Sequence, residues 1–102
     1  MDLLTQAARD VLVERQRQIT EEGFTPERDD RLTLSDLAEA AACYAWAADA
    51  DVESFPPGEP PAAMWPWEHA LWKPGDQRRM LVKAGALILA EIERLDRAAS
   101  RA

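Results

Sequence analysis

The sequence predicts an all-α domain, and three observations lead to this prediction. Apolar residues recur at intervals of three and four over long stretches, whereas period-two alternation never lasts beyond a few residues. Six of the seven prolines fall within residues 54–75, so no long element is expected there. We expect three main helices, at about 2–22, 34–49 and 75–98, with a Pro/Trp-rich irregular segment packed across them. The 102 residues should form a single α-helical domain spanning 1–102, because separate cores seldom form in so short a chain.

The composition is that of a globular acidic protein. Hydrophobic residues make up 47% and charged residues 30% of the chain, so it can bury a core and keep a hydrated surface. The net charge of -7 has the wrong sign for holding a phosphate backbone. Cys43 and His69 are the only cysteine and histidine, which excludes an internal disulfide and a conventional zinc site. No apolar run approaches the roughly 18 residues of a membrane span, and residues 1–4 lack signal-peptide features, so a cytoplasmic location is expected.

The first helix, at 2–22, is predicted by apolar residues at near-helical spacing, namely Leu4, Ala8, Val11, Leu12 and Ile19. Gly23 can take the left-handed conformation that ends a helix, and Pro26 prevents the helix from resuming. A second helix is expected to begin at the capping sequence 33–36 and to continue through an Ala-rich stretch, with a narrow face that lets a neighbour approach closely.

The last helix is predicted from Pro74 or Asp76 to about residue 98 by an i, i+4 apolar pattern, namely Leu81, Ala84, Ile88, Ile92 and Leu95. Residues 84–90 have no polar member, so we expect this stretch to be surrounded by other elements. Gly85 costs about 1 kcal/mol in helix propensity, and we expect Trp46 or a loop tryptophan to pack against it. The apolar surface predicts a possible homodimer as well, because three short helices cannot cover all of it.

The strongest candidate site combines indole rings with the cationic start of the last helix. Indole faces can stack on a base, while cations and the amides of a first helical turn can bind phosphate. The predicted ligand-binding or partner-binding residues are Trp65, Trp67, Trp72, Lys73, Arg78, Arg79 and Lys83. In the alternative structural interpretation, the tryptophans cap the core and the two arginines pair with the acidic loop 27–30.

A second hypothesis concerns magnesium, which prefers carboxylate oxygens. Asp36 and Glu39 lie three residues apart on one predicted helical face, and Glu22 with Asp30 could join them. The pair, within the sequence DLAE, resembles the acidic pairs of MazG-like nucleoside triphosphate pyrophosphohydrolases, although the second family pair is matched only by Glu93 and Asp96 near the chain end. The alternative is an ordinary solvated acidic face with no metal or cofactor.

Blocks along nearly the whole chain resemble a family of small proteins of phages and prophages of Gram-negative bacteria. They are ERQRQI at 14–19, EGFTPE at 22–27, DD at 29–30, LA at 37–38, AAACYA at 40–45, WPW at 65–67, WKP at 72–74, RR at 78–79 and LVKAGALILAEIERLDR at 81–97. The resemblance implies a phage accessory protein in the cytoplasm of a bacterial host cell. A looser similarity, to the ryanodine-receptor repeat domain, implies nucleotide-like ligands.

These observations favour a non-catalytic phage or prophage accessory protein that recognises a nucleotide-like ligand or a host protein, for example in host defence inhibition. One alternative is the magnesium-dependent pyrophosphohydrolase, so the sequence leaves catalysis open. Another is an acidic mimic of nucleic acid, because the charge of -7 creates a substantial field around a small protein. Neither direct nucleic-acid binding nor membrane binding is expected.

Overall fold

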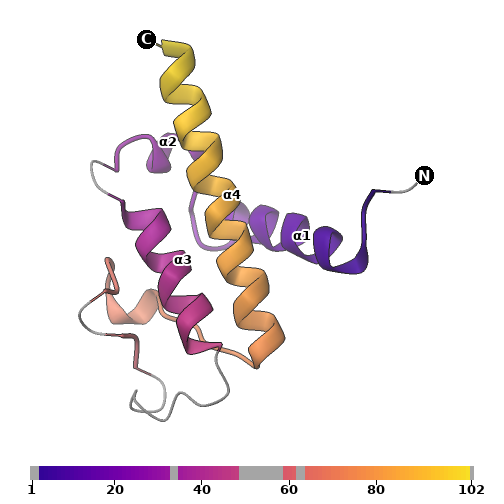
Figure 1. The fold of residues 1–102 in the computed structure, drawn as a ribbon. Helices are drawn as coiled ribbons and strands as arrows, with labels where there is room; N and C mark the ends of the chain where they lie inside the picture. Colours follow the sequence, from indigo (N-terminus) through magenta and orange to yellow (C-terminus); the bar gives the residue numbers. More distant parts are fainter. Residues whose placement is uncertain (1–2, 33–34, 49–58, 62–63, 102) are drawn as a thin grey trace.

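The computed structural model describes residues 3–32, 35–48, 59–61 and 64–101. The long helices of this part are α1 (Gln6–Thr20), α3 (Asp36–Ala47) and α4 (Gln77–Arg101) (Figure 1). They are accompanied by the short helix α2 (Pro26–Asp29) and the 3-10 turn η1 (His69–Leu71). No strand occurs in these described ranges. The all-α prediction is therefore confirmed, with α2 as a short helix that the sequence pattern did not indicate.

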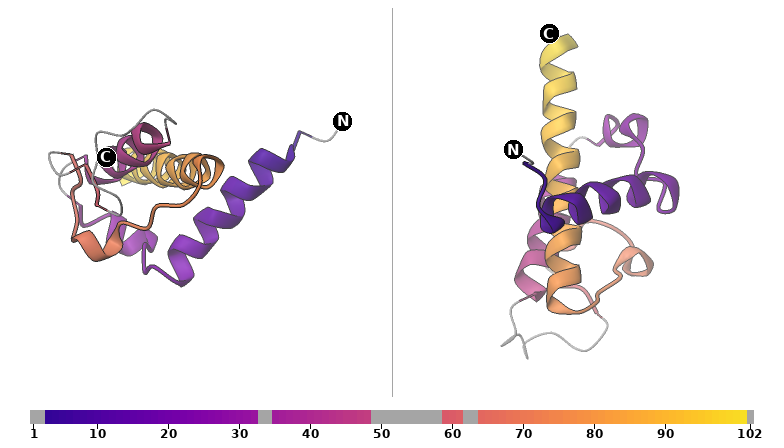
Figure 2. Two further views of the ribbon diagram at one scale, coloured as in Figure 1. Left: turned by 90° about the horizontal axis from the view of Figure 1, so that it is seen from below. Right: turned by 90° about the vertical axis from the view of Figure 1, so that its right-hand side faces the viewer.

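α4 is the central element of the molecule. α3 runs alongside its amino-terminal part, α1 crosses it steeply, and its carboxy-terminal turns extend beyond the other helices (Figures 1 and 2). Residues 64–76, here called the tryptophan segment, lie on the side of α4 where α1 and α3 leave room between them (Figure 2). The prediction that the irregular segment packs across the helices holds for this part, whereas residues 49–58 lie outside the described residues.

The helix ends follow local capping chemistry. Thr5 accepts a hydrogen bond from Ala8 N (3.1 Å), so α1 begins later than the predicted residue 2. Gly23 has φ of 76°, as its predicted role in ending the first helix requires. Asp76 accepts a hydrogen bond from Arg79 N (2.8 Å), which makes Asp76 rather than Pro74 the start signal of α4. Ser35 caps α3 without a side-chain hydrogen bond, and Thr33 of the predicted capping box lies outside the described residues.

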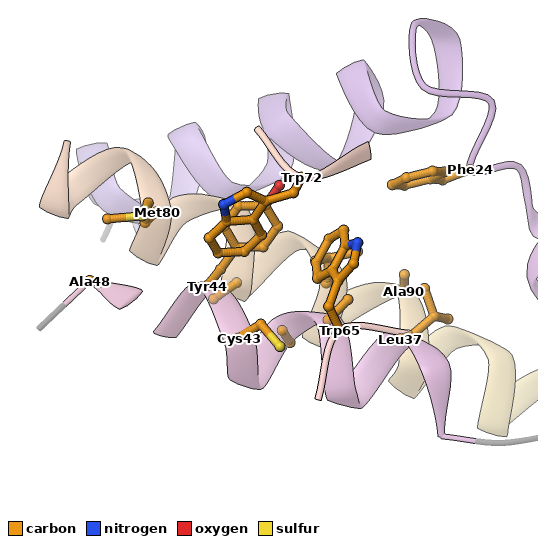
Figure 3. Close-up of a cluster of buried hydrophobic side chains, with 13 residues drawn as sticks. Phe24, Leu37, Cys43, Tyr44, Ala48, Trp65, Trp72, Met80 and Ala90 are labelled. Atoms are coloured by element: carbon orange, nitrogen blue, oxygen red, sulfur yellow. The ribbon is translucent and has the colours of Figure 1, made fainter. Parts of the chain in front are cut away.

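The hydrophobic core lies between α3, α4 and the tryptophan segment (Figure 3). Small residues of α3 and α4 bring the two helices close, and Cys43 among them is fully buried, as a small core residue should be. Burial raises the pKa of the Cys43 thiol to about 11, with Glu39 adding to the effect. The buried members are Phe24, Leu37, Ala40, Ala41, Cys43, Tyr44, Ala48, Trp65, Trp72, Met80, Ala84, Leu87 and Ala90.

On two helices the apolar pattern does not coincide with the buried side. α1 buries the polar residues Glu14, Arg15 and Gln18, while Leu4 and Leu12 are 46% and 48% exposed. α4 buries residues such as Ala86 and Leu87, and the predicted apolar face is half exposed except at Ala84. The reason is that α4 is apolar on two opposite sides, and α3 and the tryptophan segment cover only one of them.

Gly85 is a close-contact position, but its neighbour is not an indole ring. A Cβ atom at residue 85 would lie 3.2 Å from Cγ2 of Val11, so α1 crosses α4 at this glycine. The predicted contact with Trp46 or a loop tryptophan is therefore wrong.

Within the described part of the chain, none of the helices combines the length and apolar character that a membrane span requires.

Candidate functional site

The candidate site begins with the polar face of α1. Glu14, Arg17 and Gln18 occupy positions i, i+3 and i+4 and therefore share one side of the helix. Glu14 is 1% exposed and Gln18 3%. Glu22 follows just after the helix, and its side chain is also largely buried. Carboxylates at such depth require cationic partners, because an unpaired buried charge is costly.

Cations from three elements meet these carboxylates. Arg17 binds Glu14 through two hydrogen bonds of 2.7 and 2.9 Å and reaches Glu22 at 3.1 Å. Lys73 Nζ lies 2.6 Å from Glu22 Oε1, and Arg79 donates to Glu14 from the start of α4. Together with Lys83, these side chains form what we call the charge cluster, which consists of Glu14, Arg17, Glu22, Lys73, Arg79 and Lys83.

The cluster lowers the pKa of both carboxyls. Burial works to raise the pKa of Glu14, but hydrogen bonds and charge from Arg17 and the charge of Arg79 hold it below its ordinary value. The same balance lowers the pKa of Glu22, where Lys73 and Arg17 oppose the effect of burial. Both groups are therefore carboxylates at neutral pH, and the four cations leave the cluster with a formal charge of about +2.

Lys83 differs from the other cations in the cluster. It is 8% exposed, and its ammonium donates to the carbonyl oxygen of Lys73 (2.5 Å) and lies 5.7 Å from the centre of the Tyr44 ring. No carboxylate oxygen among the described residues lies within 4 Å of it. Burial lowers the pKa of Lys83, with the charges of Glu14 and Glu22 opposing this effect. An ammonium of this kind can bind an anion.

Aromatic rings cover the cluster on the side of the tryptophan segment. Tyr44 stacks on Trp72 with 4.5 Å between ring centres, and Trp65 meets both rings edge-on at 5.7 and 5.0 Å (Figure 3). The hydroxyl of Tyr44 also accepts a hydrogen bond from Lys73 N (3.0 Å). Trp67 contacts Phe24 at 5.1 Å, and Arg28 lies over both of these rings. Both Trp65 and Trp72 are thus packed against neighbouring rings.

A small cavity lies between the charge cluster and these rings. It has a volume of about 10 Å³, which suits a single water molecule. Two buried polar atoms of its lining residues, Gln18 Oε1 and Trp67 Nε1, have no hydrogen-bond partner within the described part of the chain. Buried polar atoms are almost always paired, so two unpaired atoms around one cavity indicate a place for a polar guest. The lining residues are Glu14, Arg17, Gln18, Glu22, Phe24, Tyr44, Trp65, Trp67, Leu71, Lys73, Lys83 and Leu87.

The structure brings most of the predicted site residues together. Trp65, Trp67, Lys73 and Lys83 line the cavity, Trp72 packs behind Trp65, and Arg79 reaches Glu14 from the opposite side. Arg78 is separate, because it pairs with Asp10 on the outer surface of α1 at 2.8 Å.

The acidic loop does not pair with the two adjacent arginines. Asp29 is bound by Arg15 and Arg28, and Asp30 by Arg97 and Arg101. That part of the alternative interpretation is wrong, whereas the buried positions of Trp65 and Trp72 agree with its core-capping role for the tryptophans.

Sequence reasoning missed the contribution of α1 and Tyr44. The spacing of Glu14, Arg17 and Gln18 is a polar stripe at helical intervals, which was the available signal, but stripes of this kind ordinarily face solvent. Only the tertiary structure shows that Glu14 and Gln18 of this stripe are buried, with Arg79 of α4 pairing with Glu14.

The alternative magnesium ligands are not gathered into one site. Among the described residues, no group of three or more His, Cys, Asp or Glu side chains could share a metal ion. Glu22 is engaged by Lys73 and Arg17, while Asp36 and Glu39 lie in the first turn of α3.

Comparison with known proteins adds no relative. No protein-family model, curated protein or solved structure matches the chain.

Proposed function

We propose that the chain is a non-catalytic binding protein for a nucleotide-like ligand, and that it recognises the anionic end of that ligand at the charge cluster. The observation that carries this proposal is the pair of unpaired atoms, Gln18 Oε1 and Trp67 Nε1, on one cavity with the ammonium of Lys83. The ammonium and the indole N–H can donate to phosphate oxygens, and the amide oxygen can accept from a protonated oxygen or an N–H of the ligand.

Local charge supports an anion rather than a cation. The four cations of the cluster outnumber Glu14, Glu22 and the nearby Glu21, which pairs with Arg17 at 3.3 Å, so the local formal charge is about +1 in a chain whose net charge is -7. The charge of a guest anion would oppose the effect of burial that lowers the pKa of Lys83. The biological setting within this proposal, a phage or prophage accessory protein in a bacterial cell, rests only on the sequence resemblance.

The ring geometry changes the expected role of the tryptophans. Trp65 and Trp72 are 8% and 7% exposed and already stack on or abut Tyr44, so a base could reach them only by disrupting the core. Trp67 is more exposed and offers its N–H as well as its ring edge. Because the cavity holds about 10 Å³, a phosphate group enters only if Trp67 and Leu71 move outward.

Isothermal titration calorimetry with ATP, ADP, ADP-ribose and inorganic phosphate tests the proposal. We expect at least one probe to bind, and Lys83→Met to weaken its binding at least ~10-fold, because a hydrogen bond to a charged group contributes about 1.5–3 kcal/mol. Trp67→Phe should weaken binding several-fold, since it keeps most of the ring but removes the N–H. Arg78→Gln is the matched control, because Arg78 lies outside the cavity.

Two outcomes would contradict the proposal. One is the absence of heat for every probe at millimolar concentration, and the other is equal affinity of the wild type and Lys83→Met. Circular dichroism and thermal unfolding of each variant establish that a loss of binding is not a loss of fold.

A further inference from the structure

We infer that the charge cluster binds a phosphate monoester as its monoanion, and that Gln18 recognises the hydroxyl group that this monoanion retains. This assignment rests on the anion site of the proposed function and adds which anion the site selects. A phosphate monoester keeps one P–OH until its second ionisation, at a pKa of about 6. Sulfate and phosphate diesters have no such hydroxyl at neutral pH.

The hydrogen bonds of Gln18 fix which of its amide atoms faces the cavity. Nε2 donates to Glu14 Oε2 at 3.2 Å, and the backbone carbonyl oxygen of Gln18 accepts from Phe24 N at 2.9 Å. Burial opposes the ionisation of Glu14, but Arg17 and Arg79 hold its pKa below the ordinary value, so at neutral pH it is a carboxylate, which only accepts hydrogen bonds. Nε2 must therefore face Glu14, and Oε1 is the amide atom that has no partner in the described part of the chain.

An oxygen acceptor at this depth discriminates between anions. Gln18 is 3% exposed, so its side chain is shielded from bulk water. A fully deprotonated oxyanion presents only acceptors and would leave Oε1 buried and unpaired, which is costly. A P–OH group instead donates to Oε1, while its oxygen accepts from a neighbouring donor.

Lys83 and Trp67 provide such donors. An ammonium has three N–H groups, and Lys83 uses one of them for the carbonyl oxygen of Lys73 (2.5 Å). Trp67 adds its unpaired indole N–H. Both side chains line the cavity together with Gln18, and its volume of about 10 Å³ corresponds to one oxygen atom with its hydrogen. We therefore expect the deepest atom of a bound phosphate to be the hydroxyl oxygen.

The two deep groups belong to long helices, Gln18 to α1 and Lys83 to α4. They therefore keep their positions when Trp67 and Leu71 move outward to admit the rest of the phosphate group. The acceptor and the ammonium thus define the selectivity of the site in its open form as well as in its closed form.

Calorimetric titration of the full chain with inorganic phosphate and with sulfate, at about pH 6, tests the selection of a protonated anion. We expect phosphate to bind at least ~10-fold more tightly, because sulfate leaves Gln18 Oε1 unpaired. Charge alone would favour sulfate, which is a dianion at this pH, so a preference for phosphate reports the hydrogen bond.

Gln18→Met removes the acceptor and should reduce the phosphate-to-sulfate ratio of affinities at least ~10-fold. Gln16→Met is the matched control, because Gln16 is an exposed glutamine of the same helix that does not line the cavity. This control should keep the ratio of the wild type. The ratio compares two anions on one protein, so a general loosening of the fold does not by itself change it.

AMP and cyclic AMP test the class of ester. They carry the same base, but AMP is a monoester that can retain a P–OH, whereas cyclic AMP is a diester that cannot. We expect the wild type to bind AMP at least ~10-fold more tightly than cyclic AMP, and Gln18→Met to lose most of this difference.

The outcomes separate this assignment from the proposed function. Sulfate binding as tight as that of phosphate, or a ratio that Gln18→Met leaves unchanged, would overturn the assignment while the charge cluster remains an anion site. Binding of ATP or ADP-ribose without binding of any of these four probes would do the same. No binding of any probe would overturn both. If circular dichroism shows that Gln18→Met does not fold, the wild-type ratios of phosphate to sulfate and of AMP to cyclic AMP still decide.

Discussion

At the scale of single residues, the protein depends on charges that are buried and paired. Glu14 is 1% exposed and is held by Arg17, Gln18 and Arg79 from two helices. Asp29 is equally buried, but burial raises its pKa despite Arg28 and Arg15. The two acids therefore have opposite linkages to folding: Glu14 favours the folded state when it is ionised, whereas ionisation of Asp29 opposes folding.

Glu14→Gln should lower the free energy of unfolding at pH 7 by about 2 kcal/mol, because it leaves Arg17 and Arg79 without their carboxylate. The folded pKa of Glu14 is lowered, so its contribution is complete above the unfolded value near 4.5 and is lost as pH falls through the folded pKa. Urea unfolding between pH 3 and 7 measures this effect. The stability of the variant should fall less steeply below pH 4.5 than that of the wild type, and parallel curves would contradict the assignment. Asp29→Asn is the control, with a smaller loss at pH 7.

At the scale of elements, α1 and α4 meet where α4 has no side chain. The Cβ atom of an alanine at residue 85 would lie 3.2 Å from Val11 Cγ2 and 3.4 Å from its Cγ1, which is a tight contact. The crossing of the two helices therefore explains why α4 keeps a glycine in its middle, where alanine would favour the helix by about 1 kcal/mol.

Gly85→Ala should leave the stability within about 1 kcal/mol of the wild type, because helix propensity and the contact with Val11 act in opposite directions. In the background of Val11→Ala the contact is removed, so the same substitution should become stabilising. A double-mutant cycle by chemical denaturation should therefore give a favourable coupling of at least ~0.5 kcal/mol. Additive effects would mean that the crossing does not constrain Gly85.

At the scale of the whole molecule, ion pairs join the amino-terminal third of the chain to α4. Arg79 reaches Glu14, Arg15 reaches Glu93 at 3.0 Å, and Asp30 is bound by Arg97 and Arg101. The last turns of α4 extend beyond the core (Figure 1), so the pairs with Asp30 are what holds them beside α2.

Asp30→Ala should increase amide hydrogen exchange in residues 94–101 and leave residues 80–90 unchanged, because the latter are held by core packing. The pKa of Asp30 is lowered by its hydrogen bonds to Arg97 and Arg101, so the wild type should show the same local loosening as pH falls below the ordinary range of aspartate. Exchange measured by mass spectrometry at two pH values tests both expectations. Uniform protection along α4 in the variant would show that these pairs do not order its end.

The sequence by itself determined the helical class, the number of long helices, the break at Gly23 and the packing of Trp65 and Trp72, because these follow from local periodicity, backbone freedom and hydrophobicity. It also placed Lys73, Lys83, Trp65 and Trp67 near one another.

Only the tertiary structure decided which side of each helix is buried. α1 buries Glu14 and Gln18 rather than Leu12, because Arg79 of α4 helps to neutralise Glu14, and no local pattern reports a partner 65 residues away. By pattern alone, Leu81, Ile88, Ile92 and Leu95 form a core face of the last helix, yet these residues remain about half exposed because the core forms on another side of α4.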